Sequence, residues 1–235
     1  MTADIDRAAR FATQAAGQAA RQAPPYEIIK QAIIKGDLLP GQPLVESVLA
    51  ATCQVSRTPI REALTRLEQD GLIERSDRGL IVRERSPEEI LDIYQVRIVL
   101  EGTVAASAAN RRNEHDIRLL RSLLKQSDQV GTDDDEAKVE VNRAFHHAVW
   151  AAGHNDCLLD LLERLDLHLG RYPATTLSFP GRWHEAKHEH GKLVDAIEQR
   201  DGAAAQECAL GHFSRARDIR LDLWYQADAS NAAQT

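Results

Sequence analysis

Histidines are the side chains best suited to metal or proton chemistry in this sequence, and all nine lie after residue 114. His146, His190 and His212 are predicted to face the core of three separate helices, because apolar residues recur about one turn away from each. Asn142 precedes His146 by one turn, and its amide oxygen is a further potential ligand. A single histidine on such a face is usually a structural core residue. Three of them with a nearby amide favour a metal site.

Arg97 and Glu101 lie one turn apart within an otherwise apolar helical stripe, formed by Ile90, Ile93, Val104 and Ala108. Buried charges need partners. Two interpretations therefore remain open. The pair forms an internal salt bridge that fixes a helical bundle, or Arg97 anchors an anionic ligand in a central cavity.

A competing motif is H-E-x-x-H, the zinc-protease signature, formed by His184, Glu185 and His188. On a helix the two histidines would share a face, and Glu185 could act as a general base. Short patterns of this kind arise by chance in a His-rich segment, and the surrounding residues are polar. We keep a zinc-dependent hydrolase as the alternative function and predict that the protein is not an enzyme.

Arg57 and Arg61 project from one helix face, because they lie four residues apart. A guanidinium group can bind guanine or a phosphate in bidentate fashion. Ser56, Thr58 and the amides of the same helix start are natural phosphate ligands. Taken alone, such an arginine pair is usually a solvated surface, so its interpretation depends on the elements around it.

Those elements read as a winged helix-turn-helix. A helix follows Pro24, a second is expected over Val45–Thr52, and a third begins after the N-cap Ser56 with Pro59 in its first turn. Two short β-capable runs, 72–75 and 80–83, then form a hairpin. In such a domain the third helix enters the major groove.

Charge supports this interpretation locally rather than globally. The net charge is −7, but residues 1–85 hold 12 basic against 11 acidic side chains. Seven arginines and no lysine lie between residues 54 and 85. Arg78 and Gly79, at the predicted hairpin tip, could reach the neighbouring minor groove. A local arginine cluster matters more for phosphate contact than the charge of the whole chain.

The rest of the chain is predicted to be helical. Ser86, Pro87 and Glu89 form a capping-box pattern, and later breaks divide the segment into about six helices of an antiparallel bundle. The prediction is therefore a mainly α protein with four parts: an Ala-rich flexible arm (1–22), a winged helix-turn-helix domain (23–84), an all-helical effector-binding and dimerisation domain (87–227), and a flexible tail (228–235).

Neither a membrane span nor a secretory leader is predicted, since no apolar run approaches the ~18 residues needed. The three cysteines are odd in number and far apart, which favours reduced thiols and a cytoplasmic location.

Residues 36–41, 44–46, 55–64 and 67–73 together resemble the N-terminal domain of GntR-family transcriptional regulators. The resemblance implies that Arg57, Thr58, Pro59, Arg61 and Gly79 contact double-stranded DNA. It also implies that Glu46 helps to position the reading helix.

Residues 94–101, 142–146, 189–190 and 211–212 resemble the FCD effector domain of the FadR-like subgroup. The resemblance implies a divalent metal, zinc or nickel, held by an Asp and three His, with a small carboxylate effector beside it. His146, His190 and His212 match the histidines, and Asn142 stands where the family usually has Asp. Arg97, Glu101 and Asn142 are the expected effector contacts. The implied regulator is a homodimer, more often a repressor, on a near-palindromic operator.

Overall fold

The computed structural model describes residues 10–15, 17, 23–77, 79–131, 133–169 and 176–232. The chain divides into two compact units. One comprises Met1–Arg85 with Asp166–Pro173, and the other comprises Ser86–Leu165 with Ala174–Thr235. No described helix is long and apolar enough to cross a membrane.

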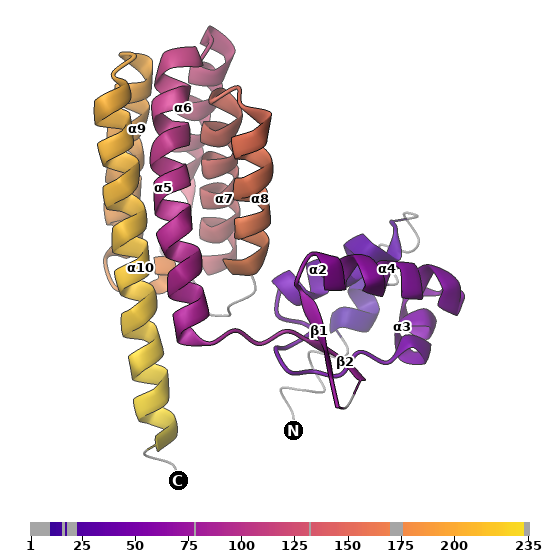
Figure 1. Ribbon diagram of the computed structural model, residues 1–235. Coiled ribbons are helices and arrows are strands. Elements are labelled where there is room, and N and C mark those ends of the chain that lie inside the picture. The colour runs from indigo at the N-terminus through magenta and orange to yellow at the C-terminus, as the bar shows by residue number, and fades with distance from the viewer. Residues whose placement is uncertain are drawn as a thin grey trace. The chain divides into compact units, whose positions relative to one another are not determined.

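The first unit contains the predicted three helices and hairpin. In chain order it runs α2 (Pro25–Ile34), α3 (Glu46–Cys53), α4 (Arg57–Gln69), β1 (Ile73–Ser76) and β2 (Gly79–Val82) (Figure 1). The strands pair antiparallel, with Ile73 opposite Val82 and Ser76 opposite Gly79. This order confirms the winged helix-turn-helix prediction.

The core of this unit comes from the apolar faces of the helices and from the inward residues of the hairpin. Its fully buried members include Ile29, Ile33, Ile60, Leu64, Leu67, Leu72 and Val82. Residues 10–15 and 17, the described part of the predicted arm, are helical, and Phe11 and Ala15 join this core. The other residues of the predicted arm lie outside the described part of the chain.

The turn between α3 and α4 sets the start of the reading helix. Gln54 ends α3 in the left-handed conformation, and Ser56 takes the extended conformation of an N-cap. The position predicted for Ser56 is therefore right. Its hydroxyl makes no capping hydrogen bond, however, so the cap rests on the backbone conformation.

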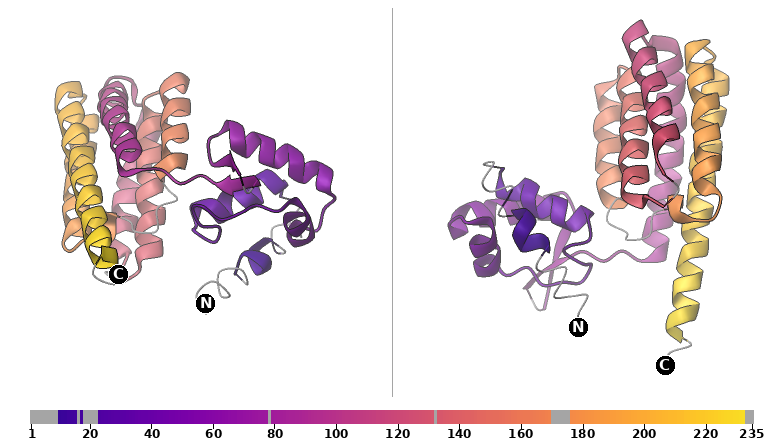
Figure 2. Two further views of the ribbon diagram at one scale, coloured as in Figure 1. Left: turned by 60° about the horizontal axis from the view of Figure 1, so that its bottom comes forward. Right: turned by 180° about the vertical axis from the view of Figure 1, so that it is seen from behind.

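Beyond Arg85 the described residues form six α-helices packed as a bundle, as predicted, and all but residues 166–169 of these helices belong to the second unit (Figures 1 and 2). They are α5 (Pro87–Arg111), α6 (Glu114–Gln129), α7 (Asp135–Ala152), α8 (Asp156–Leu169), α9 (Arg182–Glu198) and α10 (Gly202–Ala232), with a short 3₁₀ turn, η1 (Thr176–Ser178), before α9. α5 lies beside α10 and also packs on α7 and α9. α10 continues past residue 227, where the helical domain was expected to end.

Side-chain caps begin several of these helices. The predicted capping box is present: Glu89 N donates to Ser86 Oγ at 3.2 Å, and Ser86 N donates to Glu89 Oε2 at 3.1 Å. Asn113 forms an equivalent box at the start of α6. Such caps satisfy amide groups that the helix itself leaves unpaired. They fix where each helix starts, and therefore which residues face the bundle interior.

Gly153, at the end of α7, packs directly against α5. A Cβ atom there would lie 2.8 Å from Val104 Cγ2 and 3.1 Å from the carbonyl oxygen of Trp150. Gly153→Ala is therefore expected to lower the free energy of unfolding by about 1–3 kcal/mol, because backbone atoms cannot move aside cheaply. Urea unfolding followed by tryptophan fluorescence measures this in the helical unit alone, since Trp150, Trp183 and Trp224 all lie there.

Gly211→Ala on α10 is the matched control, because a Cβ there meets no described atom within 4 Å. Its higher helix propensity should leave stability unchanged or raise it by up to about 1 kcal/mol. Equal losses in both variants would contradict the packing argument.

Candidate functional site

The first turn of α4 presents its polar residues to solvent. Arg57, Thr58 and Arg61 are exposed and Pro59 is partly so, while Ile60 beside them is completely buried. The buried face anchors α4 in the domain core. The exposed face therefore carries the predicted DNA contacts on a rigid element.

Glu46 is tied to one of these contacts. Arg61 Nε donates to Glu46 Oε2 at 2.8 Å, which links the first residue of α3 to the reading helix. The pair is solvent-exposed, so it is worth at most about 1 kcal/mol of stability. Its consequence is orientation: it fixes the plane of the Arg61 guanidinium before any partner is bound.

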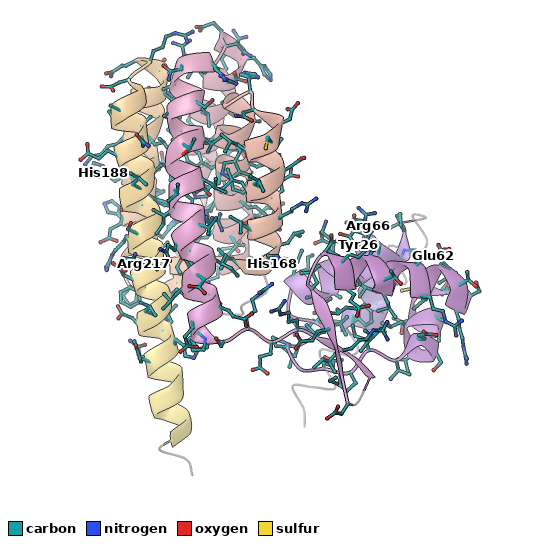
Figure 3. The ribbon with its side chains drawn as sticks, in the orientation of Figure 1. Tyr26, Glu62, Arg66, His168, His188 and Arg217 are labelled. Carbon is teal, nitrogen blue, oxygen red and sulfur yellow. The ribbon has the colours of Figure 1, made fainter. Side chains whose placement is uncertain are left out.

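Two other arginines of this unit make contacts within the domain rather than pointing freely into solvent. The Arg66 guanidinium lies 4.0 Å from the centre of the Tyr26 ring, and Tyr26 donates a hydrogen bond to Asp70 (Figure 3). Arg75 is paired with Glu68 at 3.0 Å. The arginine count alone therefore overstates the number of side chains placed for phosphate contact.

At the hairpin, Gly79 is exposed and has a φ of 98°, a conformation that side-chain-bearing residues rarely adopt. Ser76 Oγ donates to the Gly79 carbonyl at 3.1 Å, which stabilises the turn. Arg78 lies outside the described residues. The predicted role of Arg78 and Gly79 in DNA contact stays a prediction.

The three predicted core histidines meet inside the bundle. His146 on α7, His190 on α9 and His212 on α10 are 5%, 2% and 7% exposed. One nitrogen from each lies within 4.8 Å of those of the other two. Burial is the largest cause that lowers the pKa of all three, and the Arg182 charge lowers each further, while the hydrogen bond with Glu189 opposes the shift at His212. Neutral imidazoles keep the lone pair that a metal ligand needs.

Two buried polar atoms find no hydrogen-bond partner among the described residues: Nε2 of His190, a member of the cluster, and Oδ1 of Asn142, one helical turn before His146 on α7. An unsatisfied buried polar atom costs about 1–3 kcal/mol, so a protein rarely keeps one without use. Both atoms are potential metal ligands. Three imidazole nitrogens and an amide oxygen are a donor set that suits zinc or nickel. The residues present therefore fit a divalent metal ion.

His212 contacts Glu189, a residue for which the sequence analysis predicted no role. Glu189 Oε2 lies 2.6 Å from His212 Nδ1 and 2.8 Å from Arg182 Nη1, and Arg182 Nη2 lies 3.1 Å from the same Nδ1. The shorter contact, to the carboxylate, favours the tautomer with its proton on Nδ1 and the Nε2 lone pair available as a ligand. Glu189 directly precedes His190, which was the one available signal. No feature of the sequence indicated that Arg182 would be buried, with only 1% of its surface exposed.

Arg97 and Glu101 form the salt bridge that was one of the two interpretations. Arg97 Nε lies 3.1 Å from Glu101 Oε1, and Trp150 Nε1 donates to Glu101 Oε2 at 2.8 Å. The Arg97 guanidinium also lies 4.9 Å from the Phe213 ring centre, and its charge helps to lower the pKa of His146 and His212. Arg97 is thus both a structural ion-pair member and a neighbour of the cluster.

The H-E-x-x-H motif lies on the outside of α9. His184 is exposed, and so is His188 (labelled in Figure 3). Glu185 lies 3.4 Å from Arg182 Nη1 and 3.6 Å from Arg215 Nε. Within the described chain, the one metal-competent group of His, Cys, Asp or Glu side chains is the buried histidine cluster, which contains none of the motif's residues. The motif is therefore solvent-facing, and its glutamate is held by two arginines.

A groove of about 650 Å³ lies in the first unit, lined mainly by apolar residues of loop 37–45 and α3. It contains none of the histidines. The predicted metal ligands lie instead in the helical unit, at the buried histidine cluster.

Comparison with known proteins assigns both halves of the chain. Residues 25–81 match the family described as bacterial regulatory proteins, gntR family, and residues 92–215 match the FCD domain. The chain is 30% identical to the uncharacterized HTH-type transcriptional regulator YdhC of Bacillus subtilis, over 80% of this chain and 86% of that protein. It is 29% identical to the HTH-type transcriptional regulator LutR of the same organism, over 80% and 95%.

Solved structures share the fold. McbR/YncC of Escherichia coli superposes with a TM-score of 0.70 at 24% identity, covering 86% of this chain and 96% of that one. A GntR regulator from Rhodococcus sp. RHA1 gives 0.66 at 22% identity, covering 88% and 98%. The matched families and the two Bacillus subtilis relatives are transcriptional regulators, not enzymes, which rules against the hydrolase alternative. The chain belongs to the GntR family of bacterial transcriptional regulators and carries an FCD domain.

Proposed function

We propose that this regulator is a repressor whose operator affinity is set by a small carboxylate bound, through a divalent metal ion, in the helical unit. The observation that carries the proposal is the buried cluster of three histidines, His146, His190 and His212, whose ring nitrogens converge within 4.8 Å. Two similar proteins are named as repressors, one for a D-xylose utilization operon in Paenarthrobacter nicotinovorans and RspR of Escherichia coli. We infer that the chain works in the cytoplasm, where both operator and metabolite are found.

On the DNA side, α4 would lie in the major groove with Arg57 and Arg61 toward base edges or phosphates. Glu46 keeps Arg61 oriented before contact. A homodimer would present two such helices to half-sites about one helical turn apart, which matches a near-palindromic operator. Contact with DNA through α4 suits the exposed position of Arg57 and Arg61, and ligand binding in the bundle suits the buried position of the histidines.

On the ligand side, His146, His190, His212 and Asn142 would hold the ion. When bound, the ion supplies a positive charge that attracts a carboxylate. Glu189 favours the His212 tautomer with its proton on Nδ1, and Arg97 adds a second positive group beside the cluster. An effector that weakens operator binding must itself bind the DNA complex more weakly, by the same factor.

Replacing Arg57 or Arg61 with Ala should each weaken specific operator binding by about 1–3 kcal/mol, if each makes a bidentate base contact. Fluorescence anisotropy with an operator selected from random DNA by the unmodified protein measures this at fixed salt. Arg217→Ala removes the same charge from α10 of the helical unit (Figure 3) and should leave operator binding unchanged. Unaltered affinity in both α4 variants would refute the reading-helix assignment.

His190→Ala should lose most of the bound metal, because it removes a buried ligand whose Nε2 has no other partner in the described structure. Elemental analysis of protein purified without chelator or affinity tag measures the metal-to-protein ratio. His184→Ala removes an exposed histidine from the same helix and should keep the full ratio. Metal retained in His190→Ala, or lost in His184→Ala, would contradict the assignment.

A further inference from the structure

α8 is a single helix that belongs to both compact units of the chain. Its residues 156–165 are part of the helical unit, and residues 166–169 continue the same helix as part of the DNA-binding unit. Successive turns of an α-helix are joined by backbone hydrogen bonds, so a displacement at one end reaches the other. What α8 contacts in each unit therefore decides whether it can carry a signal.

In the DNA-binding unit, the end of α8 packs close to the reading helix. Leu167 packs against the apolar core to which α4 contributes Leu67. His168 Nδ1 lies 3.1 Å from Arg85 Nη2. A Cβ atom on Gly71 would lie 3.4 Å from His168 Cε1, which is van der Waals contact. The imidazole therefore lies against the turn that joins the end of α4 to the hairpin.

In the helical unit, Leu162 is the main apolar anchor of α8. Among the described residues 156–165 it alone is buried, with 0% of its surface exposed. It packs with Val104 of α5 and Trp150 of α7 in one apolar cluster. Because a buried leucine fits its neighbours closely, a shift of the Trp150 ring would move this part of α8.

Trp150 also contacts the ion pair beside the histidine cluster. Its Nε1 donates to Glu101 Oε2 at 2.8 Å, and Glu101 Oε1 lies 3.1 Å from Arg97 Nε. The Arg97 guanidinium lies 4.9 Å from the centre of the Phe213 ring, which is 5.0 Å from the centre of the His146 ring. One indole therefore contacts α8 through its ring and the buried ion pair through its nitrogen.

We propose that α8 couples the helical unit to the reading helix, with Trp150 and Leu162 as its contact in the helical unit and Leu167 and His168 as its contact in the DNA-binding unit. This inference rests on the proposed function and specifies its regulation. A ligand that changes the Arg97–Glu101 pair would act on Trp150, and α8 would pass the change to the turn that ends α4. Such coupling requires one element whose position both sites influence.

Leu162→Ala in the full chain tests the coupling without any ligand. Hydrogen–deuterium exchange of peptides that cover residues 71–85 should become about tenfold faster, because α8 no longer holds the turn from the helical unit. Leu120→Ala is the matched control, since Leu120 on α6 is equally buried but packs in another apolar cluster. It should leave this exchange unchanged. Equal exchange in the two variants would overturn the proposal.

Circular dichroism first establishes that both variants keep the helical content of the unmodified chain. If an alanine variant is unfolded, Leu162→Val and Leu120→Val make the same comparison with a smaller loss of packing.

His168→Ala tests the other end of the helix, alone and combined with Leu162→Ala. If both residues act through α8, exchange of residues 71–85 in the double variant should equal that of the faster single variant. Independent sites would instead give multiplied effects. Multiplied effects would therefore contradict the coupling role of α8.

Trp150→Phe keeps an aromatic ring beside Leu162 and removes the donor to Glu101. Zn²⁺, used alone as the probe, should change the operator affinity of the unmodified chain about fivefold or more. In Trp150→Phe that factor should fall to near one, with the same zinc-to-protein ratio. Trp183→Phe removes a buried indole N–H that has no partner in the described chain, and should keep the full factor. A full factor in Trp150→Phe would refute the role of Trp150.

The proposed function and the role of α8 fail in different experiments. If Zn²⁺ does not bind, the metal-dependent function fails, and the exchange comparison of Leu162→Ala with Leu120→Ala still decides whether α8 couples the units. If Zn²⁺ changes operator affinity equally in the unmodified chain and in Leu162→Ala, the proposed function stands and only the role of α8 falls.

Discussion

Desolvation of ionisable side chains inside the helical bundle is the constraint on which the ligand site depends. Three imidazoles, three cations and a carboxylate are nearly or fully removed from water there. An isolated charge in such surroundings is unstable, so each must be neutral or paired. Burial lowers the pKa of the three histidines, and the charged groups form ion pairs with one another. Two buried polar atoms of the described residues, His190 Nε2 and Asn142 Oδ1, keep no hydrogen-bond partner, and the proposed metal site uses both.

In the DNA-binding unit the arginines predicted to contact DNA are exposed to solvent rather than buried. Arg57 and Arg61 stay in solvent, where their charge costs little and remains available to phosphate. Only an exposed carboxylate, Glu46, restrains Arg61. Arginines therefore occur in two dielectric environments in this chain, buried in ion pairs in the helical unit and exposed on α4.

Much of the architecture follows from local signals that the sequence contains. The Ser86 capping box, the turn at Gln54–Ser56 and the hairpin glycine depend on residues close together in the chain, and the structure has the helices and strands where these signals put them. The i, i+4 pair Arg97–Glu101 was also predictable, because helix geometry alone brings the two side chains together. Element ends differ by a residue or so, since helix termini depend on weak local preferences.

By itself, the sequence determined the fold class, the reading helix and the three histidines on core-facing positions. Only the tertiary structure decided that His146, His190 and His212 meet, because which faces of distant helices pack together depends on every contact in the bundle. It alone revealed that Arg182 is buried behind His212, that Glu189 orients that imidazole, and that Glu46 engages Arg61. Periodicity assigns a residue to a face of its own helix. Long-range packing decides which other residues that face contacts, and it brings three histidines that are far apart in the sequence into one buried cluster.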